Sequence, residues 1–208
     1  MIFSQTRQFV FFAVPKTGTH SVREQLRPLL SGGDWEQQQL TGRDLSPLPG
    51  IAAIGHGHVS YGQLVASIGR EHMASLFSFA FVRHPIERFM SACAFLARTD
   101  PSYREDPVAW SQQAFARDRF RARVLIKPQT DMLTNENGDI AVSFLGRYES
   151  LQRDMNTVLH RLGETESPLV PRNVTQEDKP RLRHDTGFIR DLEAFYETDF
   201  KLLGYDPG

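Results

Sequence analysis

The sequence predicts a three-layer α/β sandwich in which helices flank a mostly parallel central sheet. Short apolar runs alternate along the chain with helical patterns, and this alternation is typical of strands joined by crossover helices. Residues 9–14 are six apolar residues in succession, as in a strand buried on both faces of a parallel sheet. A length of 208 residues suits one domain with a large core, so we expect a single domain over residues 1–208.

Each expected element follows from the period of its apolar residues and from the residues at its ends. Strands are expected at residues 9–14, 51–54, 76–82 and 140–145. Helices are expected at residues 21–30, 61–68, 85–97, 106–123, 149–162 and 188–203. Pro85 suits the first position of its helix, and Gly163 suits the end of another. Residues 164–186 are polar and without periodicity, which predicts a loop.

The composition excludes several classes of protein. Hydrophobic residues make up 40% of the chain and charged residues 24%, and the formal net charge is −1, so nothing global favours nucleic acid or an anionic membrane as partner. Cys93 is the only cysteine, which excludes an intrachain disulfide and favours a reducing compartment. No apolar run approaches the ~20 residues of a transmembrane helix, and the N-terminus does not resemble a signal peptide. We therefore expect a cytoplasmic protein without a transmembrane segment.

The segment after the first long strand is suited to binding an anion. Residues 15–21 read Pro-Lys-Thr-Gly-Thr-His-Ser and join that strand to a helix. Backbone N–H groups in such a loop, together with the N-terminus of the following helix, attract a phosphate or sulfate. Lys16 adds a positive charge, and hydroxyl donors come from Thr17, Thr19 and Ser21. The alternative is a tight strand-to-helix turn that binds nothing.

The spacing of this loop argues against a magnesium-dependent nucleoside triphosphatase. A Walker A loop places its Lys directly after the last Gly, whereas Lys16 precedes Gly18. The expected strand at residues 76–82 is followed by Arg83 rather than by a carboxylate that could hold magnesium. Both observations favour a site that neutralises its ligand with side-chain cations, and we expect no metal.

A second candidate anion site begins at the end of the expected strand 76–82. The guanidinium of Arg83 can bind a phosphate through two N–H groups, and Ser91, two turns into the next helix, can donate a hydroxyl. Arg88 can act on the same ligand or pair with a carboxylate. Helices that begin with Pro and carry Arg are common, so an ordinary surface helix is the alternative here.

Taken together, these two segments closely resemble the cofactor motifs of sulfotransferases that use 3′-phosphoadenosine 5′-phosphosulfate (PAPS). They read PKTGTHS at residues 15–21 and FVRHPIERFMSA at residues 81–92. The resemblance implies a P-loop-like fold for the sandwich, with PAPS as donor and no metal. It implies that Arg83 and Ser91 bind the 3′-phosphate. It also implies that the 5′-phosphosulfate is bound by Lys16, Thr17, Gly18, Thr19, His20 and Ser21.

Further segments resemble the same family in the same order along the chain. Residues 144–151 are similar to the segment whose Tyr lies near the adenine, which implies that role for Tyr148. Residues 127–133 resemble the Pro-Gln segment of the carbohydrate sulfotransferases, and residues 195–205 resemble their closing helix. The resemblance therefore implies a hydroxyl acceptor on a carbohydrate. His20 departs from the family pattern, since many members carry a second Thr there.

Transfer of a sulfuryl group to a hydroxyl is an in-line displacement that requires a base for the hydroxyl proton. Gly55-His56-Gly57-His58 follows the expected strand 51–54, and residues two apart in extended chain face the same side. This segment also resembles the one that carries the catalytic His of glycan uronyl 2-O-sulfotransferases. We therefore expect His58 to be the base, His56 to orient it or to contact the acceptor, and Lys16 to stabilise the leaving oxygen.

Several alternatives stay open at this point. Either histidine can be a structural residue, and further candidate bases are His20, Glu24, Asp34 and Glu36. A kinase for a nucleotide or small molecule and a non-catalytic nucleotide-binding protein are rival functions, and a tyrosyl or small-molecule hydroxyl is the alternative acceptor. A basic stretch can cover the nucleotide or can simply be solvated; it contains Arg172, Lys179, Arg181, Arg183 and His184.

Overall fold

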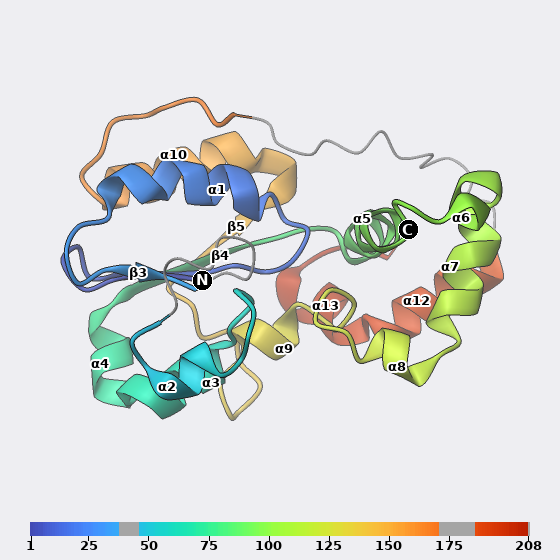
Figure 1. Cartoon of the computed structure of the whole chain (residues 1–208), viewed down its shortest axis with the longest axis horizontal. Coiled ribbons are helices and arrows are strands. Elements are labelled where there is room, and N and C mark those ends of the chain that lie inside the picture. Colours follow the sequence, from blue (N-terminus) through green and yellow to red (C-terminus); the bar gives the residue numbers. More distant parts are fainter. Residues whose placement is uncertain (38–45, 171–185, 208) are drawn as a thin grey trace. The chain divides into compact units, whose positions relative to one another are not determined.

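The structure is a computed structural model that describes residues 1–37, 46–170 and 186–207 (Figure 1). The chain forms two compact units. The first comprises residues 1–82 and 131–172, and the second comprises residues 83–130 and 173–208. The first unit contains the sheet, and the described elements that lie wholly in the second unit are helices. The expectation of a single domain stays a prediction.

A five-stranded sheet forms the centre of the first unit. Its order is β3 (Trp35–Glu36), β1 (Ile2–Ser4), β2 (Phe9–Phe12), β4 (Phe77–Val82) and β5 (Phe144–Arg147). The strands β2, β4 and β5 are parallel, whereas β1 is antiparallel to both β2 and β3. The α/β class is therefore confirmed, and the expected parallel arrangement holds for three of these five strands.

Helices cover both faces of this sheet (Figure 1). The helices α1 (Thr19–Leu26) and α10 (Leu151–Arg161) lie on one face. On the other face lie α2 (Pro49–Ala52), α3 (Tyr61–Ile68) and α4 (Arg70–Ser75). Short elements complete the unit: the 3₁₀ turns η1 (Arg27–Leu29) and η2 (Tyr148–Ser150), and the helix α9 (Thr130–Leu133) at its boundary.

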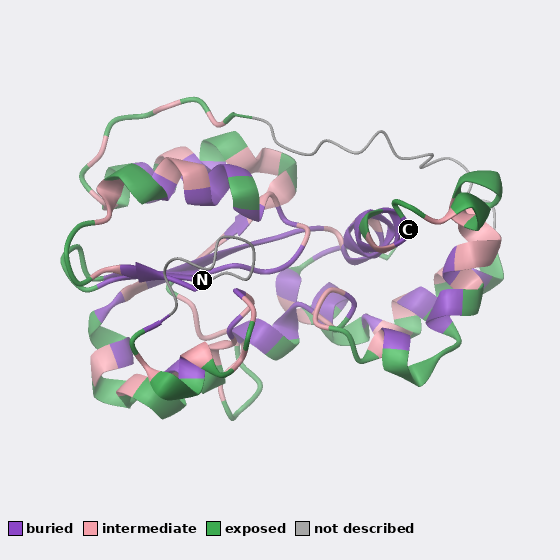
Figure 2. Ribbon diagram, viewed as in Figure 1, coloured by how far each residue is buried: buried purple, intermediate pink, exposed green. Residues whose placement is uncertain are grey.

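The core of the first unit is aromatic where β2 meets β4. Phe11 pairs with Phe79 in the parallel register, and their ring centroids are 5.4 Å apart. Both side chains are fully buried, together with Val22 from α1 and Val158 from α10. In Figure 2 the strands of the sheet are mostly coloured as buried. Burial of each phenylalanine contributes about 1.5–3 kcal/mol, so this contact holds the strand that precedes the Lys16 loop.

The second unit is built from helices around an aromatic cluster. Its helices are α5 (Pro85–Leu96), α6 (Pro101–Glu105), α7 (Pro107–Phe115), α8 (Asp118–Arg121), α12 (Thr186–Phe195) and α13 (Glu197–Leu203). The ring of Phe89 packs edge-on against Phe115 and Phe188, with centroids 5.7 and 5.9 Å away. Pro85 is the first residue of α5, as the sequence predicts.

Some expected elements differ from the observed ones. The strand predicted at residues 51–54 is wrong, because Pro49 opens the short helix α2 there and only Ile51 of that helix is buried. The strand predicted from Ile140 starts at Phe144, and Ile140 forms only an isolated bridge with Thr134. The helix predicted at 106–123 divides into α7 and α8, and the last one divides at Tyr196. No described helix is long and apolar enough to span a membrane.

Candidate functional site

The loop between β2 and α1 adopts an unusual backbone conformation. Lys16 has φ of 67° and Gly18 has φ of 79°, both in the left-handed region. This conformation costs a non-glycine residue of order 1–3 kcal/mol and is typical of residues held for function. Gly18 immediately precedes α1, so Lys16 lies in the loop just before the start of this helix. Backbone N–H groups at the start of a helix attract anions.

Gly18 also lies against the segment that contains Tyr148. A Cβ atom at position 18 would lie 2.6 Å from Cδ2 of Leu151 and 3.4 Å from ring carbons of Tyr148. Only glycine fits this close approach without a shift of its neighbours. Tyr148, for which the family resemblance implies a place near the adenine, therefore borders the Lys16 loop within the first unit.

Two of the predicted hydroxyl donors bind the protein itself in this structure. The Thr17 hydroxyl donates to the carbonyl of Val14 at 2.9 Å, and Thr17 is fully buried. The Ser21 hydroxyl donates to the carbonyl of Val170 at 2.7 Å. Thr19 is largely buried at the first position of α1. Thr17 and Ser21 thus stabilise the loop and its surroundings, and a ligand would compete for their hydroxyls.

His20 is exposed on the first turn of α1. Desolvation lowers the pKa of its imidazole below the ordinary value, and the positive charges of Arg23 and Lys16 lower it further. The ring is therefore neutral at pH 7 and offers one N–H donor, which can take the place of the hydroxyl that a threonine would supply.

His56 and His58 lie in the loop between α2 and α3, not at the end of a strand as the sequence analysis predicts. The cause is the replacement of the expected strand by α2. His58 nevertheless reaches the sheet, since its Nδ1 lies 2.6 Å from the carbonyl oxygen of Ala13, the residue that follows β2. A carbonyl only accepts hydrogen bonds, so Nδ1 carries the proton and Nε2 keeps its lone pair.

The surroundings of both histidines keep the rings neutral. Burial lowers the pKa of His58 to about 3, because desolvation outweighs its hydrogen bond to Ala13. Burial also lowers the pKa of His56. The Nδ1 atom of His56 accepts a hydrogen bond from the backbone N–H of His58 at 3.3 Å. His56 is therefore hydrogen-bonded to the backbone of His58, and the roles expected for His56 in orienting the base or contacting the acceptor stay predictions.

Arg23, which carries no distinguishing signal in the sequence, holds the loop of the two histidines. Its guanidinium is buried, forms an ion pair with Glu36 and donates to the carbonyl of Gly57 at 3.3 Å. Glu36 also binds Arg27 at 2.8 Å. Burial alone would raise the pKa of Glu36, but the hydrogen bonds from the two arginines lower it. Glu36 is thus a structural anion rather than a base.

Asp34 is also engaged in structure. Its carboxylate accepts hydrogen bonds from the side chains of Ser4 and Thr6 and from the backbone N–H groups of Thr6 and Ser31. Burial alone would raise its pKa, but these hydrogen bonds together outweigh burial and lower it. Asp34 therefore stays ionised while it ties β1 to the turn before β3.

In the second unit, Arg83 is held by both its backbone and its side chain. It follows Val82, the last residue of β4, and is 6% exposed. Its guanidinium lies 3.7 Å from the carboxylate of Glu87, and the side-chain amide of Gln129 pairs with its backbone. Ser91 is buried in α5, two turns after the helix begins. His84 contacts the C-terminal segment through the carbonyl of Asp206 and the ring of Tyr205.

Among the residues that the structure describes, Arg88 pairs with no carboxylate, one of the roles that the sequence allowed. It is fully buried, and its guanidinium donates to three backbone carbonyls, those of Leu125, Ile126 and Lys127. The ring of Tyr196 lies 5.5 Å from the guanidinium carbon. Arg88 therefore fixes the backbone of residues 125–127, next to the Pro-Gln pair. From the sequence alone, such a structural arginine cannot be told apart from an arginine that binds a ligand.

A comparison with protein families establishes the class of this protein. Residues 1–206 match the model of the sulfotransferase family. The chain belongs to the sulfotransferase family. No curated protein and no solved structure gives a significant match. A member of this family is a PAPS-dependent sulfotransferase, so the kinase and the non-catalytic nucleotide-binding protein are set aside.

The described residues of this sulfotransferase include two places that attract anions. In the first unit, Lys16 precedes the N-terminus of α1, where backbone N–H groups attract negative charge. In the second unit, Arg83 carries a buried guanidinium. Within residues 1–37, 46–170 and 186–207, no three His, Cys, Asp or Glu side chains are placed to hold a metal ion. The predicted basic residues Arg172, Lys179, Arg181, Arg183 and His184 lie outside the described residues.

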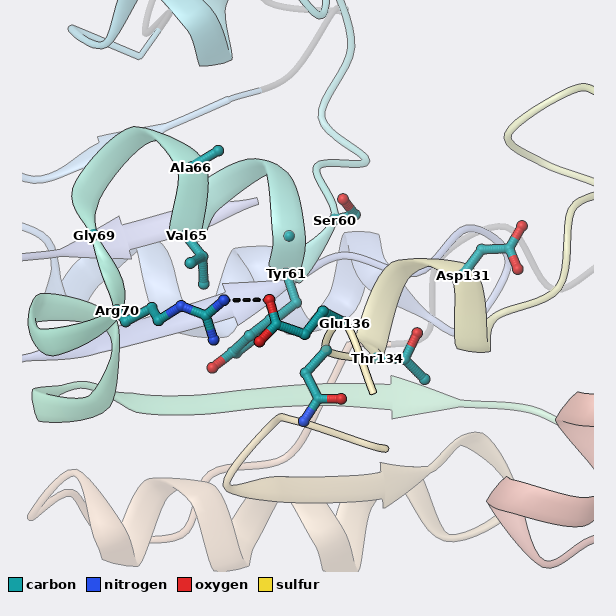
Figure 3. Close-up of a pocket in the computed structure, with 11 residues that line it drawn as sticks. Ser60, Tyr61, Val65, Ala66, Gly69, Arg70, Asp131, Thr134 and Glu136 are labelled. Carbon is teal, nitrogen blue, oxygen red and sulfur yellow. Dashed lines mark hydrogen bonds and ion pairs between the residues drawn. The ribbon is translucent and has the colours of Figure 1, made fainter. Parts of the chain in front are cut away.

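The first unit of the sulfotransferase also contains a surface pocket of about 670 Å³ (Figure 3). It begins two residues after His58, at Ser60 and Tyr61, where α3 starts. The Tyr61 ring packs 6.0 Å from Phe12, at the end of β2. Other polar groups of the lining are the ion pair of Arg70 with Glu136 and the side chains of Asp131, Thr134 and Asn135. The pocket therefore combines one aromatic ring with several hydrogen-bonding groups close to the histidine loop.

Proposed function

We propose that this sulfotransferase transfers the sulfuryl group of PAPS to a hydroxyl of a carbohydrate, with His58 as the base. The observation that carries this proposal is the hydrogen bond between His58 Nδ1 and the Ala13 carbonyl. It leaves the lone pair on Nε2 and holds the ring beside the strand end that leads into the Lys16 loop. A neutral imidazole in this position is ready to accept a proton.

In this proposal each end of the donor has its own set of binding residues. The 5′-phosphosulfate is bound by residues 16–21, that is Lys16, Thr17, Gly18, Thr19, His20 and Ser21. Arg83 and Ser91 bind the 3′-phosphate, and Tyr148 borders the purine. The left-handed backbone at Lys16 and Gly18 and the close contact of Gly18 with Tyr148 support these roles.

The reaction follows from these positions. The acceptor oxygen forms a bond to sulfur while the bond from sulfur to the phosphate oxygen of the donor breaks, and the hydroxyl proton passes to Nε2 of His58. Lys16 stabilises the charge that develops on the leaving oxygen. A pKa of about 3 keeps His58 neutral before the reaction. The negative charge of the bound donor favours the protonated ring and so raises its basicity when transfer takes place.

The pocket beside the histidine loop supports a carbohydrate as acceptor. Sugars bind through the apolar face of a ring on an aromatic side chain and through hydrogen bonds to their hydroxyls. Tyr61 supplies the aromatic side chain, and Asp131, Thr134 and Asn135 supply polar groups. The likeness of residues 127–133 to the Pro-Gln segment of carbohydrate sulfotransferases points to the same acceptor class.

The proposal is tested by transfer of ³⁵S-labelled sulfate from PAPS to separate pools of glycans, tyrosine peptides and phenols. We expect label in the glycan pool. We also expect His58→Gln to lose at least a hundredfold in turnover while its affinity for 3′-phosphoadenosine 5′-phosphate (PAP), measured by calorimetry, stays within twofold. Label in the peptide or phenol pool alone would overturn the carbohydrate assignment, and unchanged turnover in the variant would remove His58 from the mechanism.

A further inference from the structure

Asp199 in α13 is a buried carboxylate in the second unit. The residue has no exposed surface. Its Oδ2 accepts hydrogen bonds from the backbone N–H and the side-chain amide of Gln129, at 2.9 and 3.2 Å. Its Oδ1 accepts from the backbone N–H and the hydroxyl of Thr130, at 2.9 and 2.8 Å. Such burial is costly for a charge unless partners compensate it, and here four donors do so.

The side-chain amide of Gln129 connects the Asp199 carboxylate to the backbone of Arg83. Its Oε1 accepts from the backbone N–H of Arg83 at 2.9 Å, and its Nε2 donates to the Arg83 carbonyl at 2.8 Å. The backbone N–H only donates, while the carbonyl and the Asp199 carboxylate only accept. These partners therefore determine which end of the amide is oxygen and which is nitrogen. One side chain thus satisfies both backbone polar groups of Arg83.

We propose that Gln129 and Asp199 are positioning residues for the 3′-phosphate of PAPS, because they fix the backbone from which the Arg83 guanidinium extends. This inference rests on the proposed role of Arg83 in binding that phosphate. Gln129 is 1% exposed, and its orientation is set by Asp199, so the backbone of Arg83 is held before any ligand binds. Glu87 restrains the other end of the side chain at 3.7 Å. A cation held in this way loses little freedom on binding, which favours affinity and specificity.

A purely structural role makes a different prediction from a positioning role. If the Asp199–Gln129 contacts only stabilised the second unit, their loss would lower stability and would weaken all nucleotides alike. If they position Arg83, their loss weakens ligands with a 3′-phosphate and spares those without one. PAP and adenosine 5′-monophosphate (AMP) differ only in that phosphate. The ratio of their dissociation constants therefore separates the two roles.

The experiment measures Kd for PAP and for AMP by calorimetry in five proteins. These are the wild type, Arg83→Gln, Gln129→Met, Asp199→Asn and Thr130→Val. Gln129→Met keeps the length of the side chain but none of its hydrogen bonds to Arg83, and Asp199→Asn keeps the shape but removes the charge. Thr130→Val is the matched control, because it removes one hydrogen bond to Asp199 without touching Gln129.

We expect Gln129→Met and Asp199→Asn to weaken PAP about tenfold, the cost of ordering one long side chain, and AMP less than twofold. Thr130→Val should leave the ratio of the Kd for AMP to the Kd for PAP within twofold of its wild-type value. If the wild type does not prefer PAP, or if Arg83→Gln keeps the preference, the proposed donor role of Arg83 fails. If Arg83→Gln loses the preference while the Gln129 and Asp199 variants keep it, the positioning role is overturned. Equal weakening of both nucleotides overturns it as well. Should Gln129→Met not fold, Asp199→Asn decides.

Discussion

The enclosure of His58 predicts a specific dependence of stability on pH. Burial lowers the pKa of this imidazole from the ordinary 6.5 to about 3, so the folded protein does not protonate the ring as the pH falls, whereas the unfolded chain does. The unfolded state therefore binds more protons below pH 6.5. It follows that His58 destabilises the fold progressively between about pH 6.5 and pH 3, and that this effect is absent above pH 7.

The magnitude follows from the two pKa values. One proton bound only by the unfolded state changes the free energy of unfolding by about 1.4 kcal/mol per pH unit. Between pH 7.5 and pH 5.0 the contribution of His58 therefore amounts to a loss of about 2 kcal/mol. His58→Gln cannot titrate, and its Nε2–H can donate to the Ala13 carbonyl in place of the imidazole. The variant should lose about 2 kcal/mol less than the wild type over the same interval.

The assay is urea denaturation of both proteins at pH 7.5 and pH 5.0, followed by circular dichroism. All other titrating groups, including His20 and His56 with their lowered pKa values, are present in both proteins. Their contributions therefore cancel when the change in unfolding free energy between the two pH values is compared for wild type and variant. The same property predicts that kcat/KM for the wild type shows no acid limb near pH 6.5. A pH dependence of stability that is equal in wild type and variant would refute the enclosure of the His58 ring.

Three further variants test the loop, the second unit and the pocket. Gly18→Ala should lose about 1–3 kcal/mol more stability than Gly138→Ala in urea denaturation. Both residues have positive φ, but only at Gly18 does the new Cβ meet a neighbour, so equal losses would contradict this reasoning. Arg88→Met should lower the free energy of unfolding by about 3 kcal/mol or more, since three carbonyls lose their donor, and a loss below about 0.5 kcal/mol would show that these contacts are not formed. Tyr61→Ala should raise KM for a glycan acceptor about tenfold and leave the Kd for PAP unchanged, whereas Tyr61→Phe should keep both; a change in PAP affinity instead would remove the pocket from acceptor binding.

The parts of the fold that the sequence predicts well are those with a strong local signal. Residues 9–14 and 76–82 are long apolar runs, and they form the central strands β2 and β4. The strands β1 and β3 have three and two residues and carry no usable period, so the sequence does not predict their antiparallel pairing. Residues 51–54 are apolar as in a strand, but Pro49 and Gly50 begin a helix there, and local turn chemistry prevails over hydrophobicity.

The residues that support the site are harder to predict than those that carry its charge. Lys16 and Arg83 can be identified from the sequence because each lies within two residues of the end of a long apolar run. Arg23 and Asp199 do not, because each acts on a backbone group far away in the sequence: Arg23 on Gly57, and Asp199 on residues 129–130. An arginine or aspartate within an amphipathic helix is most often solvated, and only the fold shows that these two are buried. Buried charges that bind backbone far from their own element are therefore the first places to look for residues that position a predicted site.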